Sequence, residues 1–517
     1  MLLLLISAIT SLSAADWNQS LKGYCANLFT EYENPTTLSP ELERIFRSSR
    51  VIPPLKGDDR DLELIHVQSM IRLGARSPVE EHIVRFNMEE TAKWDCSFNE
   101  SFMPEEIQQP LFYKMYDASP QHNLLKGTCA KGQLLAEGAY QTRILGDIVR
   151  EAYFSDNNVF RDKSKSLVDP TTADTSDGFS KLFYVRSTDK AQTRMSASNA
   201  MSTVLKAFDT SGQPLPIHTI DIEHETLDPN LMGYCPEVTL AFKLAATSAE
   251  KRALEKIDLN VRKSVYKAFE ADLDDVWPWG VMDIIKSHLC AGKIDQLPYD
   301  LQPLDEARQD FMAKALKATD DEGMFQYHYD NALFSKASMV RLMVDIKAHF
   351  LGAYAEFAEQ KSVHNDTLDS LVTEFWQRID DFKTLNRGNQ PKFVLRAAHA
   401  QTIMSLLASL DIWQAEDGHF VFPPFASMLN FEYYAAPMKH TFYVRILYNG
   451  DVITSRLEGC HGRTICNVLE MFSASQFASP ELYADSCLPT NPRNGSRKNG
   501  IRLGQVVLLL MAGALFA

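Results

Sequence analysis

The stretch LELIHVQSMIRLGARSP, residues 62–78, decides the fold. Apolar and small side chains alternate along its first eleven residues, which predicts a buried strand that runs into a turn at Gly74. The side chains on one face of this strand are Ile65, Val67, Ser69 and Ile71. Arg72 and Arg76 flank the glycine, and two guanidinium groups at a strand end match the oxygens of a phosphate group. Leu73, between Arg72 and Gly74, is an unusual residue in such a turn.

Two later junctions between a strand and a helix have the same form. The β-prone run Leu182–Val185 comes directly before Arg186 and a helical pattern at 195–208, and the short strand Phe393–Leu395 precedes His399 and an apolar helix at 402–410. Because the ends of neighbouring parallel strands meet at one edge of a sheet, we expect these cations to share one crevice.

The rest of the chain alternates helical and extended patterns. An amphipathic helix is predicted at 132–154, and the stretch from 209 to 389 is mainly helical. Two later strands, at 428–434 and 441–448, precede a turn signal at Asn449-Gly450.

Length and charge limit the possible functions. The chain has 517 residues, 23% of them charged and 45% hydrophobic, which is typical of a globular protein larger than one ordinary core. We therefore expect one α/β domain with an inserted subdomain, or two domains. The formal net charge of -15 argues against nucleic acid as a partner. An anion site must then be a local group of arginines.

The N-terminal end indicates export. Residues 1–15 are an apolar run followed by small residues, which predicts a secretory signal peptide, with a buried N-terminal helix as the alternative. Residues 16–60 form an N-terminal extension. The sequons at Asn18, Asn99 and Asn365 agree with passage through the secretory pathway.

The C-terminal end resembles a lipid-attachment signal. Asn494 begins three small residues, and a polar spacer and an apolar tail follow. The tail is shorter than the roughly 20 residues that span a bilayer. We expect a linker at 488–494, a glycosylphosphatidylinositol (GPI) anchor at Asn494 and removal of residues 495–517, with a short hydrophobic anchor or a disordered tail as the alternative. The mature protein would lie on the outer face of the plasma membrane or on an endo-lysosomal membrane.

Cysteine usage agrees with export. The eight cysteines are Cys25, Cys96, Cys129, Cys235, Cys290, Cys460, Cys466 and Cys487. An even number is expected of a disulfide-bonded secreted protein. None forms a CxxC pair, so the sequence offers no support for a zinc site, and we expect neither metal nor cofactor.

Four motifs occur in order along the chain: RLGARSP (72–78), KGQLLAEGAYQTRILGDIVR (131–150), YVRSTDKAQTRMSA (184–197) and RAAHAQTIMSLLASL (396–410). They resemble the RHGxRxP turn, the helix with spaced G, Q and LG, the VRSTDxxRTxxSA segment and the HD or HAE segment of the histidine acid phosphatases, branch 2 of the histidine phosphatases. The resemblance covers Asp61 to Cys487. It implies an α/β fold with a central mixed sheet flanked by helices. It also implies a mostly helical cap drawn from two insertions, near Phe86–Ser176 and Asp209–Asn389.

The resemblance assigns roles to single residues. The phosphate-binding set that it implies is Arg72, Arg76, Arg186 and His399. Leu73 stands where the family has its histidine nucleophile, and leucine has no lone pair with which to attack phosphorus. Ala400 stands where acid phosphatases have the acidic aspartate, and Gln401 where the HAE form has glutamate. A further departure is Gln192, where the family commonly has arginine.

The resemblance also proposes disulfides. These are Cys96–Cys129, Cys460–Cys466 and Cys235–Cys487, which leaves Cys25 and Cys290. One sequence does not settle the connectivity.

These observations predict a secreted or surface-anchored, acid-phosphatase-like protein that is catalytically inactive. The alternatives are an active phosphomonoesterase with a non-standard mechanism and a surface interaction protein that makes no use of the site. The arginines would face a phosphate or a phosphorylated small molecule, or a carboxylate from the cap, or they would only brace the loops. The family resemblance makes a homodimer possible.

Overall fold

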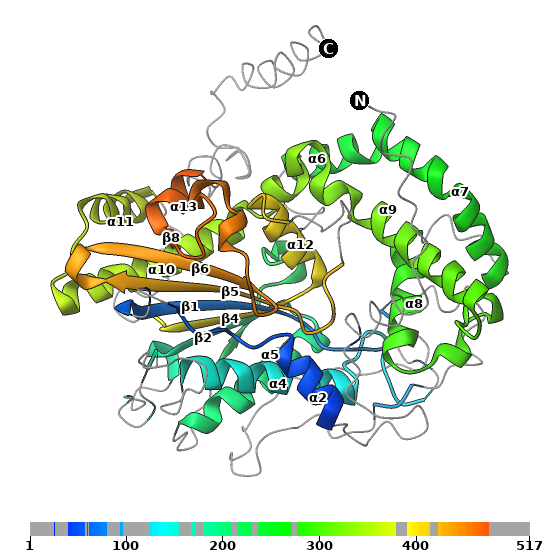
Figure 1. Ribbon diagram of the computed structural model, residues 1–517, viewed down its shortest axis with the longest axis horizontal. Helices are drawn as coiled ribbons and strands as arrows, with labels where there is room; N and C mark the ends of the chain where they lie inside the picture. The colour runs from blue at the N-terminus through cyan, green and yellow to red at the C-terminus, as the bar shows by residue number, and fades with distance from the viewer. Residues whose placement is uncertain are drawn as a thin grey trace, which may run out of the picture.

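A computed structural model of the chain describes residues 40–56, 61–79, 127–154, 179–208, 215–229, 236–270, 277–378, 390–413 and 422–474, together with Cys25, 59, 94–96, Leu125, 167, 168, 170 and 173 (Figure 1). In this part of the chain, a sheet lies between two helical layers, and an arch of further helices extends beyond one end of it. The mixed α/β fold predicted from the sequence is confirmed.

The sheet is mixed. Its strands are β1 (Glu63–Arg72), β2 (Phe183–Ser187), β3 (Ile217–His218), β4 (Phe393–Ala398), β5 (Met428–Ala436), β6 (Thr441–Tyr448), β7 (Asp451–Val452) and β8 (Cys466–Asn467). They are ordered β3-β2-β4-β1-β5-β6-β7, and β8 also pairs with β6. The neighbours from β3 to β1 are parallel, whereas β5, β6, β7 and β8 pair antiparallel. The C-terminal ends of β1, β2 and β4 therefore meet at one edge.

Strand β1 is central because both of its faces are covered. Nine of its ten residues are buried. Val67 and Ile71 belong to the apolar cluster on one face of the sheet, and Met70 belongs to the cluster on the other face. From Val67 onward this agrees with the period of two in a strand and with burial on both sides. The prediction that Ile65 shares the face of Val67 and Ile71 is wrong: Ile65 belongs to the other cluster, because the strand register shifts between Leu64 and His66.

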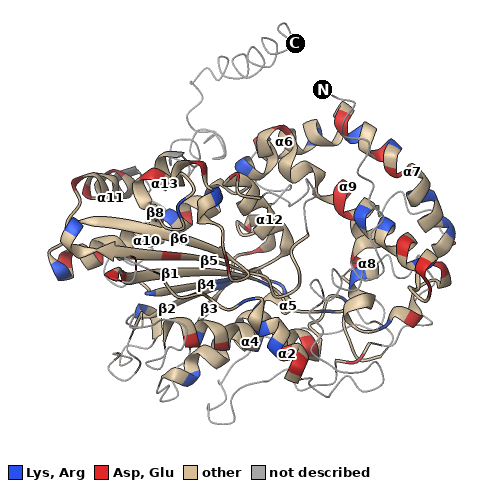
Figure 2. Ribbon diagram, viewed as in Figure 1, with Lys and Arg blue, Asp and Glu red and all other residues tan. Residues whose placement is uncertain are grey.

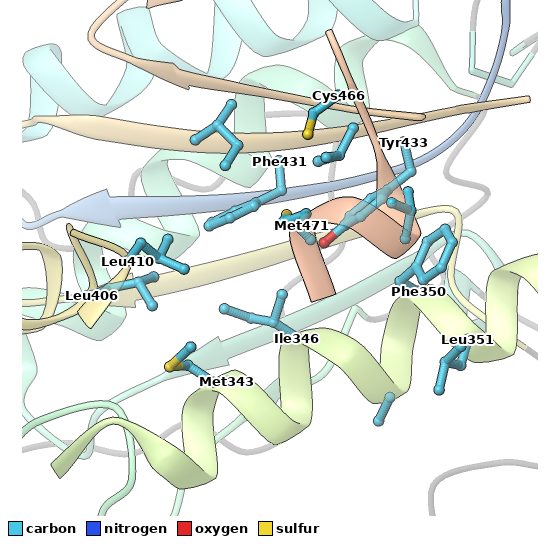
Figure 3. Packing of buried hydrophobic residues seen from close by; sticks show 14 of the residues in the cluster. Met343, Ile346, Phe350, Leu351, Leu406, Leu410, Phe431, Tyr433, Cys466 and Met471 are labelled. Carbon is cyan, nitrogen blue, oxygen red and sulfur yellow. The ribbon is translucent and has the colours of Figure 1, made fainter. Parts of the chain in front are cut away.

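Helices cover the two faces of the sheet. The helices on one face are α2 (Pro40–Ser48), α4 (Ala136–Tyr153) and α5 (Ala191–Val204), and those on the other face are α10 (Val340–Lys361), α11 (Asp366–Arg378), α12 (Ala400–Ser409) and α13 (Val468–Ala474). In the second layer, Ile346 and Phe350 of α10 point toward Phe431 and Tyr433 of β5 (Figure 3). Burial of these side chains holds α10 against the sheet.

The arch consists of four helices, α6 (Pro236–Ala246), α7 (Ala249–Phe269), α8 (Trp279–Cys290) and α9 (Glu306–Ser338). Charges of both signs are interspersed along α7 and α9 (Figure 2). Helix α9 is interrupted near its end, where Asp330, Asn331 and Ala332 have left-handed backbones. The predicted insertion Asp209–Asn389 thus divides: α6 to α9 form the arch, whereas α10 and α11 belong to the layer on the sheet. Helix α4 from the first predicted insertion likewise packs on the sheet.

Several local predictions can be compared with the structure. Asn449 and Gly450 both have positive φ values, as a two-residue hairpin between β6 and β7 requires. The disulfides in the described residues are Cys25–Cys290, Cys96–Cys129 and Cys460–Cys466. The predicted pair Cys235–Cys487 lies outside the described residues.

Other predictions fall on segments that the structure leaves undescribed. The signal peptide, the linker, the GPI segment with Asn494, and the sequons Asn18 and Asn99 all lie there. Asn365 is described: it lies half-buried before α11, and its amide donates to the carbonyl of His440. Among the described residues, no helix is long and apolar enough to cross a membrane.

Candidate anion site at the strand ends

The turn after β1 is held by backbone hydrogen bonds. Leu73 N donates to the carbonyl of Ala398 at the end of β4, and its own carbonyl accepts from Ala426 N. Gly74 is required here by close packing, because a Cβ at this position would lie 2.2 Å from the carbonyl oxygen of Gly138 in α4. The turn is thereby fixed between β4, the loop before β5 and helix α4.

Leu73 lies in an apolar environment. Its side chain is only 2% exposed and belongs to a cluster that contains Leu135, Phe425 and the disulfide Cys25–Cys290. The same cluster includes apolar side chains of α8. Leu73 therefore helps to join the turn to the arch, and it brings no polar atom to the site.

Arg72 and Arg76 extend from the turn toward the loop before β5. Arg72 donates to the carbonyl of Pro423, and its guanidinium lies 5.0 Å from the ring centre of Phe422 and 4.1 Å from that of Phe425. Arg76 Nη2 lies 2.7 Å from Asp283 Oδ1. The aromatic rings hold the Arg72 guanidinium in place, and a carboxylate engages Arg76.

The arch supplies charged residues that sequence analysis missed. Asp283 and Lys286 lie three residues apart on α8, so they share one face of this helix. Lys286 pairs with Asp320 of α9, and its ammonium lies 4.2 Å from the ring centre of Phe422. Charged residues within the apolar helix WGVMDIIKSHLC were the available signal, because such residues are rarely buried without a partner. We call Arg72, Arg76, Lys286, Asp283 and Asp320 the strand-end cluster.

His399 is a hydrogen-bond donor at this edge. Thr193 donates its hydroxyl proton to a backbone carbonyl, that of Thr188 at 3.0 Å or that of Lys190 at 2.9 Å. The Thr188 hydroxyl lies 2.8 Å from that of Thr193 and 3.0 Å from His399 Nε2, and it accepts from Nε2 when it donates to Thr193. Nε2 also lies 3.4 Å from Asp228 Oδ2, which can only accept when ionised. We infer that the neutral ring carries its proton on Nε2, so this nitrogen has no lone pair for attack on phosphorus.

The electrostatic surroundings keep His399 neutral. Burial lowers its pKa well below the usual value, and the positive charges of Lys190, Arg76 and Arg72 lower it further. Burial also raises the pKa of Asp228, against the effects of Lys190 and of the 2.7 Å hydrogen bond from Thr402. A bound anion would offset these positive charges.

The two residues after His399 supply no acid. Ala400 is 2% exposed and packs in an apolar cluster with Met404 and Phe422. Gln401 is half-buried in the first turn of α12. Neither side chain can donate a carboxyl proton to a leaving group.

Arg186 lies deeper in the sheet than the sequence suggests. In the strand pairing, Arg186 of β2 lies beside Arg396 of β4. Arg396 in turn lies beside Met70 of β1, whereas Arg72 of β1 lies beside Ala398, two residues further along β4. This separation of two strand residues is about 7 Å. Thr188, just past β2, is the residue that contacts His399.

Arg186 is engaged by a different carboxylate. Its Nη2 lies 2.7 Å from Glu225 Oε1, and its charge acts on the pKa values of Asp345 and His349, which belong to α10. Burial raises the pKa of Glu225 in spite of Arg186. The expected group of three arginines is thus divided: Arg72 and Arg76 lie at the strand-end cluster, and Arg186 belongs to the network under α10.

Comparison with known proteins identifies the family. Residues 63–449 match the histidine phosphatase superfamily (branch 2). This protein belongs to that superfamily. This chain is 21% identical over 452 residues to counting factor 60 of Dictyostelium discoideum. The match covers 84% of this chain and 90% of that protein.

Solved structures of similar fold include phosphatases and phytases. A multiple inositol polyphosphate phosphatase of Bifidobacterium longum, in complex with inositol hexasulfate, is 14% identical, with a TM-score of 0.47 and coverage of 86% of this chain and 100% of that one. A phytase of Hafnia alvei is 13% identical, with a TM-score of 0.47 and coverage of 84% and 100%.

The motif resemblance found in the sequence aligns three residues of this chain with the family's nucleophile and acid. They are Leu73, Ala400 and Gln401. Arg72, Arg76 and His399 remain around the altered positions. Within the described residues, no group of three or more His, Cys, Asp or Glu side chains could hold a metal ion.

Proposed function

We propose that this protein is a catalytically inactive histidine phosphatase that binds a phosphorylated small molecule at its strand-end cluster. The observation that carries the proposal is Leu73, which stands at the nucleophile position with its side chain buried in an apolar cluster. A leucine cannot form a phosphoenzyme, so the covalent route is lost.

The neighbouring residues support the loss of catalysis. Loss of a positioned acid typically costs about 10² to 10⁴ in rate, and neither Ala400 nor Gln401 can act as one. His399 does not replace the missing nucleophile, because we infer that its Nε2, which faces Asp228 and Thr188, carries the proton. The site has therefore lost two separate contributions to phosphoryl transfer.

The remaining cations support binding. Arg72 and Arg76 present guanidinium groups, which bind phosphate oxygens through paired hydrogen bonds, and Lys286 adds an ammonium group from the arch. His399 Nε2–H is a further donor at the same edge. These groups can hold an anion without changing it chemically.

Two measurements on purified protein test this proposal. An aryl phosphate is assayed at acidic pH with the wild type and with an Arg72→Ala, Arg76→Ala variant, and we expect the same background rate from both. Calorimetric titration with inorganic phosphate is expected to give heat with the wild type that the variant lacks. Turnover by the wild type that disappears in the variant would show an active phosphatase and overturn the proposal.

We also propose where the protein acts. The N-terminal apolar run and the C-terminal pattern around Asn494 support export and attachment to the outer face of the plasma membrane by a GPI anchor, with an endo-lysosomal membrane as the alternative location. At such a surface, a phosphorylated ligand would be met outside the cytosol.

A further inference from the structure

Two cations of the strand-end cluster, Arg76 and Lys286, are engaged by carboxylates of the arch. Asp283 of α8 lies 2.7 Å from Arg76 Nη2, and its second oxygen accepts from Val79 N at 2.9 Å. Asp320 of α9 pairs with Lys286. Each carboxylate comes from a segment more than thirty residues distant in sequence from the cation that it engages.

These contacts are of the kind that a phosphate group would make. Carboxylate and phosphate oxygens accept hydrogen bonds from the same guanidinium and ammonium groups, so the two compete for one set of donors. With Arg72, Arg76 and Lys286 positive and Asp283 and Asp320 negative, the cluster has little net charge left to attract an anion.

We propose that Asp283 and Asp320 are built-in anions of this site, and that a phosphorylated ligand binds by displacing them from Arg76 and Lys286. The inference rests on the proposed function, and it adds Lys286 to the ligand-binding residues. Helices α8 and α9 would then control the affinity for the phosphorylated ligand, because they carry the two competing carboxylates.

The geometry permits such an exchange. The side chains of Arg76 and Asp283 are 13% and 15% exposed, so this pair borders on solvent. In the second pair, Asp320 is 21% exposed and Lys286 only 6%, so the carboxylate is the partner that reaches solvent. Arg72, in contrast, is held by Phe425 and by the carbonyl of Pro423 and stays in position during the exchange. Burial raises the pKa of Asp320, although the positive charges of Lys286 and Arg72 act to lower it. The two cations therefore do not fully offset the cost of burying the carboxylate.

Calorimetric titration of the full mature chain with inorganic phosphate tests the inference at neutral pH and constant ionic strength. Asp283→Asn and Asp320→Asn keep the shape of the side chain and remove its charge. We expect each to bind phosphate about tenfold more tightly than the wild type, because one competing charge is removed at contact distance. Lys286→Gln is expected to bind about tenfold more weakly.

The matched control is Asp310→Asn. Asp310 is also on α9, but it is exposed and pairs with Lys314 on the surface of the helix. This variant changes the net charge of the protein equally, and we expect its phosphate affinity to stay within about twofold of the wild type. Thermal unfolding curves establish that each variant is folded before it is titrated.

The outcomes separate the inference from the proposed function. The exchange is supported if Asp283→Asn and Asp320→Asn both bind phosphate more tightly than the wild type while Asp310→Asn does not. It is also supported if both variants bind measurably and the wild type binds too weakly to detect. Wild-type affinity in both variants, still abolished by Arg72→Ala, overturns the exchange and leaves the proposed function standing. An absence of binding in the wild type and in both variants overturns the proposed ligand site and the exchange together.

Discussion

At the scale of the residue, Leu73 has both a chemical and a structural consequence. Under the proposed function, it takes the place of the residue that would attack phosphorus, and its side chain extends the apolar cluster between the turn and α8. Packing of this kind is sensitive to single methylene groups, because protein interiors are densely filled. Leu73 is therefore expected to stabilise the protein as well as to disable the site.

Leu73→Ala tests the structural consequence. We expect the free energy of unfolding, measured by urea denaturation, to fall by about 2–5 kcal/mol, through loss of buried apolar surface and formation of a cavity. Ile257→Ala on α7 is the control, because Ile257 is 76% exposed, and its effect is expected to stay within about 0.5 kcal/mol. A loss for Leu73→Ala as small as that of the control would contradict the role in packing.

At the scale of the element, α10 and the sheet bury a polar network. Arg396 of β4 binds Asp345 of α10 through Nε at 3.0 Å and Nη2 at 2.6 Å, and its Nη1 donates to Gln68 of β1. The rings of His66 and His349 are stacked beside this network, 6.4 Å apart. Such a network joins α10 to two strands, but it also places two imidazoles where a positive charge is costly.

This arrangement predicts acid sensitivity. Burial lowers the pKa of His349 to about 4, with Arg396 and Arg186 acting in the same direction and Asp345 opposing, and it lowers the pKa of His66 well below its usual value. In the unfolded chain both imidazoles have a pKa of about 6.5. The unfolded state therefore binds more protons, so stability is present above about pH 6.5 and is lost as the pH falls toward about 4.

The test compares unfolding free energies between about pH 6.5 and 4.5. His349→Gln is expected to reduce the slope of stability against pH by up to about 1.4 kcal/mol per pH unit, because one excluded proton no longer contributes. His364→Gln removes an exposed imidazole before α11 and serves as the control. An unchanged slope for His349→Gln would refute this account.

At the scale of the whole molecule, the site is assembled from distant parts of the chain. The turn after β1, the loop before β5 and the arch helices α8 and α9 meet around Phe422 and Phe425. The disulfide Cys25–Cys290 ties the N-terminal extension to the end of α8, and Gln141 of α4 donates to the carbonyl of Cys25. The arch, which holds the competing carboxylates, is thereby fastened to the sheet layer.

The proposed anchor is also a property of the whole chain. Cells that express the full sequence are treated with a phosphatidylinositol-specific phospholipase, and release of the protein into the medium is expected. A chain that ends at residue 494 should be secreted without treatment. Full-length protein that stays with the membrane after treatment would contradict the GPI anchor.

Many elements of the fold could be predicted from local sequence patterns. The alternation in 62–72 predicted β1, the signal Asn449-Gly450 predicted the turn after β6, and the helices around 132–154 and 402–410 have the expected form. Their boundaries shifted by only a few residues. These elements are predictable because periodicity and turn chemistry act between residues close in the chain.

The sequence by itself determined that this protein keeps Arg72, Arg76 and His399 and lacks a nucleophile at position 73, since these are matters of residue identity. Only the tertiary structure decided that Arg186 pairs with Glu225 under α10, and that Asp283 and Asp320 engage Arg76 and Lys286. The physical reason is that such pairs depend on how strands and helices far apart in sequence are packed together. The carboxylates that meet these cations therefore became visible only when the arch was placed against the strand ends.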